Sequence, residues 1–536
     1  MTSDPNWWTK ATIYQIYPRS FYLANPKARA SRLTNTPPYR TKMHPNDDIV
    51  GDIEGISAKL DYLKWLGVDA IWLSPIYPSP MADYGYDISC YTDVDPLFGS
   101  LEDMDILIKN AHARQIRVIL DWVPNHTSSL HPWFQDSISS KDSAKRDWYI
   151  WRDPKSDGGP PNNWKASLTN ESAWTFDEKS GQYYLHFFLK EQPDLNWKNP
   201  EVVREMDEVL RFWLDRGVDG FRIDVVHCTG KDEELADSDE ARAWAPRSVI
   251  HEDPSTHGLI RHWRELAKSY KQHPVLIGEV FLLTLAQIVN YYGNSDELDL
   301  AFTFPAVFVG WNAAQFRSLI LELKSLYDEK NAYPAWVLSN HDLPRHLARF
   351  RGSLNTAKCG ALMLLSLRGT PFIFQGEELG LTDVKLKPED EVDPGHRDGS
   401  RAPIPWDKSP NHGWPIDRDP WLPWPPDSDE KNAETNKLIQ EGITHTYKSL
   451  IDLRKQNLAL LNGSMEIIDG VDEKVLAYSR NEQNSSVAIL INFSTQDIEI
   501  GKFKDSEVLF DTFTNQPGGH FRGTLAGEAG VILKIR

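Results

Sequence analysis

Short apolar runs alternate with amphipathic stretches along most of the chain. The runs are rich in β-branched and aromatic residues, and polar loops containing Gly or Pro follow most of them, which is typical of buried strands. Between several runs, apolar residues recur at helical spacing, as in 56–66, 104–113 and 202–214. The pattern predicts eight strands, at 13–20, 70–75, 118–123, 220–226, 275–280, 300–304, 335–340 and 371–375.

Strands that alternate with helices indicate parallel βαβ units, and eight such units fit a (β/α)8 TIM barrel better than an open sheet. The long connection 131–196 is typical of a functional insertion. After a helix at 436–455, short strands follow one another without helices, which predicts an antiparallel β-domain. We therefore expect an α/β protein with a barrel (1–126 and 195–456), a subdomain inserted after the third strand (127–194) and a C-terminal β-domain (457–536).

Composition excludes several classes of partner. The net charge is −19, which argues against binding to nucleic acid or to an anionic membrane. The apolar runs are too short to span a bilayer. The three cysteines are far apart and form no CxxC pair, so they suggest neither a disulfide framework nor a zinc site. Residues 1–10 lack the basic and apolar regions of a secretory signal, and we expect a cytoplasmic protein.

Polar residues gather where the predicted strands end. The segments are DWVPNHT (121–127), GFRIDVV (220–226), GEV (278–280) and SNHD (339–342). In a TIM barrel, catalytic groups lie at the carboxyl ends of the strands. Three carboxylates, those of Asp224, Glu279 and Asp342, end three different strands, and we expect them to converge over one pocket.

Such a trio suits glycoside hydrolysis with retention, which needs a nucleophile and a proton donor about 5–5.5 Å apart. Burial and neighbouring anions raise a carboxyl pKa and so supply the donor. Arg222 lies two residues before Asp224 on the same face of a strand, where its guanidinium would keep that carboxylate ionised. A single Asp at a strand end is often a helix N-cap, and Arg-x-Asp can be a simple salt bridge. Four such clusters in order favour catalysis.

The four segments resemble the signature regions of the α-amylase superfamily, glycoside hydrolase family 13. The stretches WWTKATIYQIYPRSF, MADYGYDIS, QPDLNW and RDGSRAPIPW are similar to the branch that contains oligo-1,6-glucosidases, α-glucosidases and sucrose or trehalose isomerases. The resemblance covers essentially the whole chain. It implies a barrel with a subdomain after strand three and a C-terminal β-sandwich.

The resemblance also implies roles for single residues. Asp224 matches the nucleophile, Glu279 the general acid and then base, and Asp342 the carboxylate that grips ring hydroxyls. The residues that match substrate-binding positions are Asp83, Tyr86, His126, Arg222, His341 and Arg397.

Two of these positions close the pocket around a terminal glucose. Tyr86 would stack on the sugar ring, and Asp83 would bind its far hydroxyls. Arg397 would either bond Asp83 or form a structural ion pair in a long loop. A pocket closed in this way implies attack at the non-reducing end of short α-glucosides. No cofactor is required, and we expect a monomer or a homodimer.

The resemblance leaves the reaction and the linkage open. A retaining exo-α-glucosidase is favoured, with transfer to a second sugar competing with water. Val225 follows the nucleophile and favours α-1,6 linkages, although a strand valine can simply pack in the barrel. A trehalose or sucrose isomerase, or a transglucosidase, is the alternative, but the arginine-rich loop of isomaltulose-forming enzymes is not evident. A non-catalytic carrier would lack the carboxylates and carry a membrane span.

The segment 44–52 (HPNDDIVGD) is similar to a metal loop of the form D-x-N-x-D-x-I-x-D, with His44 in place of the first Asp. Oxygen atoms are the ligands that Ca²⁺ prefers. We expect either a structural calcium remote from catalysis or a surface turn without metal. The ligands would be Asn46, Asp48, the Val50 carbonyl and Asp52.

Overall fold

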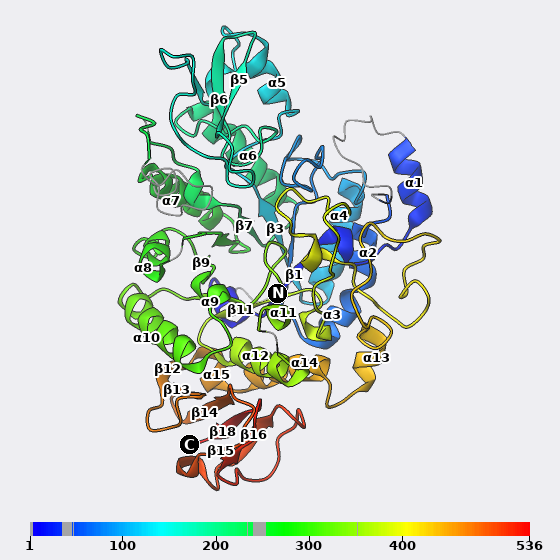
Figure 1. The fold of residues 1–536 in the computed structure, drawn as a ribbon, viewed down its shortest axis with the longest axis vertical. Coiled ribbons are helices and arrows are strands. Elements are labelled where there is room, and N and C mark those ends of the chain that lie inside the picture. The colour runs from blue at the N-terminus through cyan, green and yellow to red at the C-terminus, as the bar shows by residue number, and fades with distance from the viewer. Residues whose placement is uncertain are drawn as a thin grey trace.

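A barrel of eight parallel strands forms the centre of the molecule in this computed structural model (Figure 1). The structure describes residues 4–34, 46, 48–232, 234–238, 253–282, 284–350 and 352–535. A parallel bridge between Phe302 and Ala335 joins β9 to β10 and closes the barrel, which confirms the expected fold. In sheet order its strands are β10 (Ala335–Val337), β11 (Thr370–Phe374), β1 (Ile13–Ile16), β2 (Ala70–Leu73), β3 (Arg117–Trp122), β7 (Gly220–Ile223), β8 (Val275–Gly278) and β9 (Leu300–Ala301).

Several strands end earlier than their apolar patterns predict. The strand expected at 13–20 ends at Ile16, and a 3₁₀ helix follows at Pro18–Ser20. The strand expected at 220–226 ends at Ile223, and Val225 has a left-handed backbone with φ of 34°. The residues beyond the strand ends turn out of the sheet. This turn explains why consecutive apolar residues overstate strand length, and it places the polar residues over the end of the barrel.

Helices surround the barrel (Figure 1). Two predicted helices are each broken in two, 56–66 at Lys59 and 436–455 at Gly442. A further helix, α1, lies between β1 and β2. The helices are α1 (Pro26–Thr34), α2 (Ile53–Ala58), α3 (Leu60–Leu66), α4 (Leu101–Ala113), α6 (Pro200–Asp215), α7 (Ser255–Lys268), α8 (Leu285–Ile288), α9 (Pro305–Phe308), α10 (Ala313–Glu329), α11 (His346–Phe350), α12 (Leu354–Ser366), α13 (Ala433–Leu438), α14 (Ile443–Gln456) and α15 (Leu458–Asn462).

Large aromatic rings fill the inside of the barrel. Trp72, Phe302 and Phe372 contact one another, with ring centroids 5.0–6.4 Å apart. All three are almost fully buried. The Arg222 guanidinium lies over the Trp72 ring, 5.2 Å from its centroid. The apolar core therefore forms the floor on which the charged groups at the strand ends rest.

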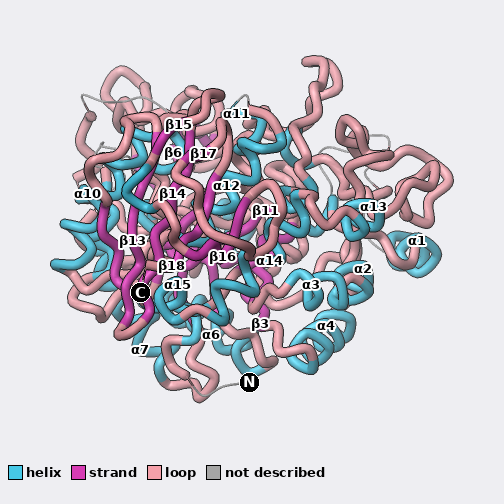
Figure 2. Tube along the Cα trace, turned by 90° about the horizontal axis from the view of Figure 1, so that it is seen from below, coloured by secondary structure: helices cyan, strands magenta, loops and turns pink. Residues whose placement is uncertain are grey.

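The connection between β3 and β7 carries a small antiparallel sheet, β4 (Trp151–Arg152), β6 (Gln182–Leu185) and β5 (Trp174–Asp177), and the helix α5 (Pro132–Ser139). Figure 1 shows β5, β6 and α5 at the top of the molecule and the C-terminal strands at the bottom. The C-terminal part contains a five-stranded antiparallel sheet that packs on α12 and α15 (Figure 2). The strands are β12 (Ser464–Ile467), β13 (Val475–Glu482), β14 (Ser485–Asn492), β18 (Gly530–Lys534) and β16 (Glu507–Asp511), with β15 (Ile498–Glu499) pairing β17 (Thr524–Leu525).

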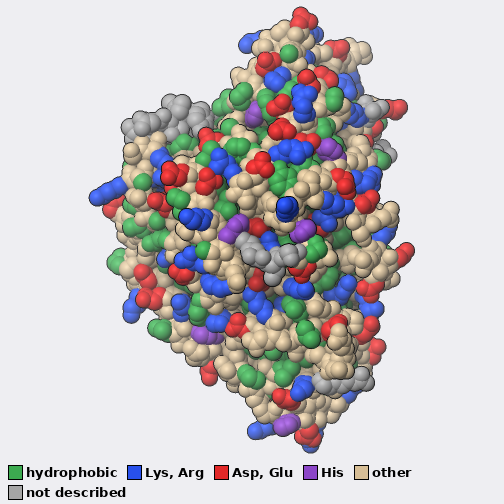
Figure 3. Space-filling view, turned by 180° about the vertical axis from the view of Figure 1, so that it is seen from behind, with side chains coloured by type: hydrophobic (Ala, Val, Ile, Leu, Met, Phe, Trp, Pro, Cys, Tyr) green, Lys and Arg blue, Asp and Glu red, His purple; other side chains and the backbone are tan. Residues whose placement is uncertain are grey.

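The surface carries charges of both signs. On the face drawn in Figure 3, Asp and Glu side chains are interspersed with Lys and Arg. Within the described ranges, no helix combines the length and the apolar character that a membrane crossing requires. The three cysteines are free thiols.

Candidate active site

Arg222 holds three carboxylates at the end of the barrel. One terminal nitrogen, Nη1, donates to Asp121 Oδ1 at 2.6 Å and to Asp224 Oδ1 at 2.7 Å. The other, Nη2, donates to Glu279 Oε2 at 2.5 Å. The arginine is 1% exposed. Because one small planar group contacts both, Asp224 and Glu279 face the same space.

Val225 supplies a further hydrogen bond within this cluster. Its backbone N–H donates to Glu279 Oε2 at 3.0 Å. The left-handed backbone at Val225 aims this N–H back towards the end of β8, from which Glu279 follows. A β-branched residue in that region is strained, and such strain is characteristic of functional sites.

The third carboxylate, Asp342, lies between cationic groups of the long loop after β11. Arg397 Nη1 donates to Asp342 Oδ1 at 3.0 Å, and Arg401 Nη2 donates to the same oxygen at 3.2 Å. Burial alone would raise the pKa of Asp342, but His341 and these arginines lower it to about 2. Asp342 is therefore ionised throughout the neutral range.

Asp83 closes one side of the site and is 4% exposed. The Arg397 guanidinium donates to Asp83, and it also holds Asp393 at 2.7 Å. Gln192 Nε2 donates to Asp83 Oδ2 at 3.1 Å. The structure thus brings Asp83, Arg397 and Asp342 together, as the motifs suggested, and adds Gln192 and Asp393.

Two buried histidines, His126 and His341, lie beside these charged groups. The His341 ring stacks on the Tyr86 ring, with centroids 5.4 Å apart and planes 10° apart, and Tyr86 Oη donates to Asp121 Oδ2 at 3.0 Å. His126 lies beside Gln192, with 3.0 Å between His126 Nε2 and Gln192 Nε2. Burial lowers the pKa of each histidine to about 3, so both rings are neutral at pH 7.

Two carboxyl groups of the cluster around Arg222 have raised pKa values. Burial raises the pKa of Asp224 well above its usual range; Arg222 opposes this effect, while Glu279, Asp121 and Asp342 reinforce it. Burial likewise raises the pKa of Asp121 to about 7. One guanidinium faces three buried carboxylates, and this excess of negative charge favours retention of a proton within the cluster.

These groups line one cavity of about 290 Å³. All three predicted catalytic carboxylates face it, as do Asp83, Tyr86, His126 and Arg397, whereas Arg222 and His341 lie behind its wall. Its remaining lining includes the apolar side chains of Leu168, Phe188, Phe281 and Leu343. The cavity therefore has a charged end and an apolar side.

Sequence reasoning missed four polar members of the site. Three of them lie within motifs that had been noticed, because Asp121 opens DWVPNHT, Gln192 opens QPDLN and Arg401 closes RDGSR. The fourth, Asp393, lies in a loop where no motif distinguishes it from other acidic residues.

The proposed metal loop already has a cation, the guanidinium of Arg29, which is 2% exposed. Its Nη1 donates to the carbonyls of Asp48, at 3.0 Å, and Val50. Its Nη2 donates to the Gly51 carbonyl at 2.8 Å, and its Nε to the Leu97 carbonyl at 3.0 Å. The Val50 carbonyl expected to ligate calcium is thus committed to a side chain.

The carboxylates of this loop also have partners in the protein, except that Asp52 Oδ2 is buried without a hydrogen bond. Asp48 pairs with Arg418. Asp52 Oδ1 accepts from the N–H groups of Gly55 at 2.7 Å and Ala24 at 3.1 Å, and so it caps α2. Asn46 is described, whereas His44 lies outside the described residues. Of the expected ligands, the Val50 carbonyl and Asp48 are thus engaged by arginines, and Asp52 Oδ1 by backbone N–H groups, which leaves little for a calcium ion in the described part of the loop. Within the described ranges no cluster of three His, Cys, Asp or Glu side chains suits a metal.

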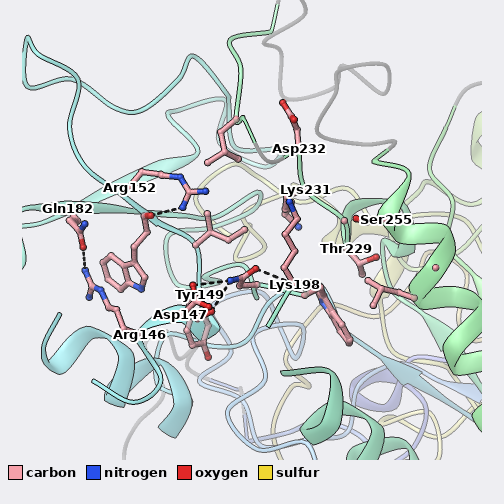
Figure 4. A pocket seen from close by; sticks show the side chains of 18 of the residues that line it. Arg146, Asp147, Tyr149, Arg152, Gln182, Lys198, Thr229, Lys231, Asp232 and Ser255 are labelled. Carbon is pink, nitrogen blue, oxygen red and sulfur yellow. Dashed lines mark hydrogen bonds between the residues drawn. The ribbon is translucent and has the colours of Figure 1, made fainter. Parts of the chain in front are cut away.

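A second, larger cavity of about 1110 Å³ lies between the inserted sheet and α7 (Figure 4). Arg146 and Arg152 line one side, and Lys231 and Ser255 line the other. None of the three predicted catalytic carboxylates lines it. The predicted catalytic residues therefore belong to the smaller cavity.

The family is decided by comparison of the sequence with known proteins. The profile described as "Alpha amylase, catalytic domain" matches residues 15–463. The chain belongs to the α-amylase family. Members of glycoside hydrolase family 13 hydrolyse O-glycosyl bonds, and the oligo-1,6-glucosidase of Parageobacillus thermoglucosidasius is 36% identical over 91% of this chain and 90% of that protein.

Two further members of this group of proteins are similar to this chain. The trehalose-6-phosphate hydrolase of Bacillus subtilis is 34% identical over 92% of this chain and 90% of that protein. The trehalulose synthase MutB from Pseudomonas mesoacidophila MX-45 superposes with a TM-score of 0.89 at 32% identity, over 99% of both chains. These similarities place the chain among α-glucosidases and their structural neighbours, as a glycoside hydrolase that acts on oligosaccharides.

Proposed function

We propose that this protein is a retaining exo-α-glucosidase that releases glucose from the non-reducing end of short α-glucosides. The contact of one guanidinium with both Asp224 and Glu279 carries the proposal. It brings a nucleophile and a proton donor to one cavity, which is the arrangement that retention requires.

Each of the two carboxyl groups has a defined task in this reaction. Asp224 attacks the anomeric carbon as Glu279 gives its proton to the departing oxygen, so the glycosidic bond breaks and a β-glucosyl-enzyme forms. Glu279, now a carboxylate, then takes a proton from water, and the hydroxyl oxygen displaces Asp224. Asp342 remains ionised and accepts hydrogen bonds from ring hydroxyls. We propose that the carboxylates around Arg222 share one proton and that Glu279 carries this proton when substrate is bound.

The closed end of the cavity supports exo-action. Asp83, Arg397 and Asp342 form a wall of buried ion pairs on one side of the carboxylates. A cavity of about 290 Å³ accommodates one glucosyl unit and the start of the next. A chain that continued beyond the terminal glucose would have to displace Asp83 and Arg397.

We further propose that the substrate is uncharged and that α-1,6 linkages are preferred. Among the described residues that line the cavity, Arg397 is the only lysine or arginine, and two buried carboxylates already hold it. His396 also lines the cavity and has a raised pKa, but it pairs with Glu391. We therefore expect weak binding of a phosphorylated sugar, in contrast to the substrate named for the related trehalose-6-phosphate hydrolase. The oligo-1,6-glucosidase relatives and Val225, beside the reacting bond, support the linkage.

Replacement of the nucleophile tests this proposal. Asp224→Asn should lower kcat on an aryl α-glucoside by several orders of magnitude, because the covalent step loses its nucleophile. Asp219→Asn is the matched control: Asp219 is also buried and immediately precedes β7, but it pairs with Arg117 and His112 at the opposite end of the strand. It should cost stability and leave kcat within about threefold. A loss of less than tenfold for Asp224→Asn would reject the assignment.

The trehalulose synthase among the structural neighbours makes an isomerase the second candidate. Incubation with sucrose, maltose and isomaltose separates the two. An α-glucosidase releases free glucose as the main product, whereas an isomerase returns a rearranged disaccharide.

We also propose that Arg29 takes the place of a structural metal ion. Four backbone carbonyls converge on its guanidinium, and an internal cation of this kind supplies the charge and the donors that the loop would otherwise obtain from calcium. The enzyme then needs no cofactor and no metal.

A further inference from the structure

We propose that the catalytic cavity contains an apolar subsite beside Glu279 that accepts an alkyl or aryl group. The enzyme then cleaves α-glucosides of apolar alcohols and phenols, and transfers glucose to such alcohols, in addition to its action on sugars. This inference rests on the proposed α-glucosidase activity, because the subsite takes the group attached to the oxygen that departs in that reaction.

The proposed reaction fixes the place of the departing group. Asp83 and Arg397 close one end of the cavity, where the terminal glucose binds. The departing oxygen then lies beside Glu279, because that residue gives it a proton. Val225 contacts Glu279 through its backbone N–H at 3.0 Å, and Phe281 follows Glu279 by two residues. Both residues line the cavity, so the group attached to the departing oxygen meets their side chains.

Two apolar walls border this part of the cavity. Phe281 and Leu343 pack against the aromatic core inside the barrel. Phe188 and Val225 pack in the core of the inserted subdomain, and the Phe188 ring also lies 5.2 Å from the His126 ring between centroids. Phe188, Phe281 and Leu343 are only partly buried, so they keep apolar surface for a ligand. These two walls form the apolar subsite.

The apolar surface continues beyond the cavity at Phe308. The Phe281 ring contacts the Phe304 ring at 4.9 Å and the Phe308 ring at 6.0 Å between centroids. Phe304 is buried, whereas Phe308 is 54% exposed. Contiguous exposed apolar surface is characteristic of ligand-binding grooves. The subsite therefore has an open end, along which a longer alkyl chain can extend.

A second sugar finds few polar partners in the subsite. Apart from the residues assigned to catalysis and to the terminal glucose, the polar side chains among the described lining residues are those of Ser167, His227, Cys228 and His396. His227 Nδ1 lies 3.2 Å from the Glu279 carbonyl oxygen, and His396 pairs with Glu391. A hydroxyl that loses water without gaining a partner weakens binding, whereas an alkyl group loses no hydrogen bond. The lining therefore favours an apolar group.

Transfer to an alcohol uses the same catalytic groups as hydrolysis. The β-glucosyl-enzyme carries glucose as an ester of Asp224. The Glu279 carboxylate takes the hydroxyl proton of the bound alcohol as the alcohol oxygen attacks the anomeric carbon. The new glycosidic bond forms, the ester bond breaks, and Asp224 leaves as a carboxylate. An alcohol held in the apolar subsite competes with water for this step.

A series of alkyl α-glucosides measures the apolar contact directly. The probes are ethyl, butyl and hexyl α-glucoside below the concentration at which micelles form, and the readout is released glucose. Their leaving alcohols have nearly equal acidity, so differences in kcat/KM report contact with the chain. Burial of one CH₂ corresponds to a factor of about two to four, so kcat/KM should be more than about tenfold higher for hexyl than for ethyl α-glucoside. A smaller ratio would overturn the proposal.

Competition between acceptors tests the transfer reaction. With 4-nitrophenyl α-glucoside as donor and equal concentrations of 1-butanol and glucose as acceptors, butyl α-glucoside should exceed the disaccharide products. An excess of disaccharide would overturn the proposal, because the glucosyl-enzyme would then select a sugar over an apolar group.

Serine variants assign the contact to the two phenylalanines. Phe281→Ser and Phe188→Ser should each lower the hexyl-to-ethyl ratio at least about threefold, the contribution of roughly one buried CH₂. The ratio is unaffected by a general loss of activity, and either variant decides the matter if the other does not fold. Phe281→Leu keeps an apolar side chain and should retain most of the ratio. If neither serine variant lowered the ratio this much, the assignment would be overturned.

Phe176→Ser is the matched control. Phe176 is 45% exposed and lies on β5 of the inserted subdomain, but it is not among the residues that line the cavity. This variant should match the unmodified enzyme on every probe, and an equal fall in its ratio would overturn the assignment to the cavity. Failure of the unmodified enzyme to release glucose from maltose, isomaltose and all alkyl α-glucosides would instead overturn the proposed function.

Discussion

Replacement of Arg397 by Met should both destabilise the protein and disable the pocket. The guanidinium contacts three carboxylates, those of Asp83, Asp342 and Asp393. Asp83 and Asp393 are 4% and 3% exposed. Removal of one partner from a buried ion pair typically costs about 3–5 kcal/mol, because it leaves an uncompensated charge.

A second arginine, Arg401, reduces the expected loss of stability. Arg401 still contacts Asp393 at 3.0 Å and Asp342 at 3.2 Å in the variant. We therefore expect a loss of about 3 kcal/mol in the free energy of unfolding, at the lower end of that range. The same residues bind the sugar, so kcat/KM should fall by more than about 100-fold, the factor that corresponds to roughly 3 kcal/mol.

Urea unfolding followed by tryptophan fluorescence measures the first quantity, and hydrolysis of an aryl α-glucoside measures the second. Arg418→Met is the matched control, because Arg418 also pairs with an aspartate, Asp48, but both side chains are substantially exposed. That variant should lose about 0–1 kcal/mol and no activity. If Arg397→Met lost no more stability and no more activity than Arg418→Met, the ion pairs of Arg397 would contribute nothing to the stability or function of the pocket.

The stability deficit of Arg397→Met should also depend on pH. The folded-state pKa of Asp342 is lowered to about 2 from an ordinary value of 3.8. A lowered pKa stabilises the folded state above the ordinary value, and that contribution is lost as the pH falls towards 2. The deficit relative to the unmodified protein should therefore be full between pH 5 and 8 and shrink below about pH 4, as urea titrations at several pH values would show.

Three further predictions concern the shared proton of the carboxylates around Arg222, the loop held by Arg29 and the preference for α-1,6 linkages. Asp121→Asn removes an anion that raises the pKa of Asp224, so the alkaline limb of the kcat/KM profile should move towards acid pH; an unmoved limb would contradict a shared proton. Dialysis against a chelator should leave the urea midpoint unchanged, whereas Arg29→Met should cost about 2–4 kcal/mol through its unpaired carbonyls; a chelator effect reversed by Ca²⁺ would contradict this. Val225→Ala should lower the ratio of isomaltose to maltose hydrolysis, and an unchanged ratio would show that Val225 does not select the linkage.

The barrel could be predicted because its strands are buried on both faces and therefore read as continuous apolar runs. The same property hides where each strand ends, since apolar residues continue into the turn, as at Val225 and Val226. Breaks in helices were missed for a related reason. At Lys59 the apolar spacing continues across the break, so periodicity alone joins α2 to α3.

The carboxylates at strand ends could be placed in one pocket because parallel strands end on the same side of a barrel. Periodicity could not place the partners supplied by loops, because it does not encode loop geometry; family motifs indicated Asp83 and Arg397, but other loop partners carry no such signal. The position of Asp393 beside Arg397 is one example, and the hydrogen bonds from Arg29 to the 46–52 loop are another. Both depend on how segments that are distant in the sequence pack together. Conversely, the motif suggested calcium ligands that the folded loop commits to hydrogen bonds.

The central claim is that Asp224 forms a covalent bond with glucose. The most direct measurement is incubation with 5-fluoro-α-glucosyl fluoride, a substrate whose glucosyl-enzyme hydrolyses slowly, followed by mass spectrometry of the peptides. We expect one fluoroglucosyl group attached to Asp224, together with α-glucose as the first product from an ordinary substrate. Attachment to Glu279 or Asp342, or β-glucose as the first product with no attachment, would contradict the account.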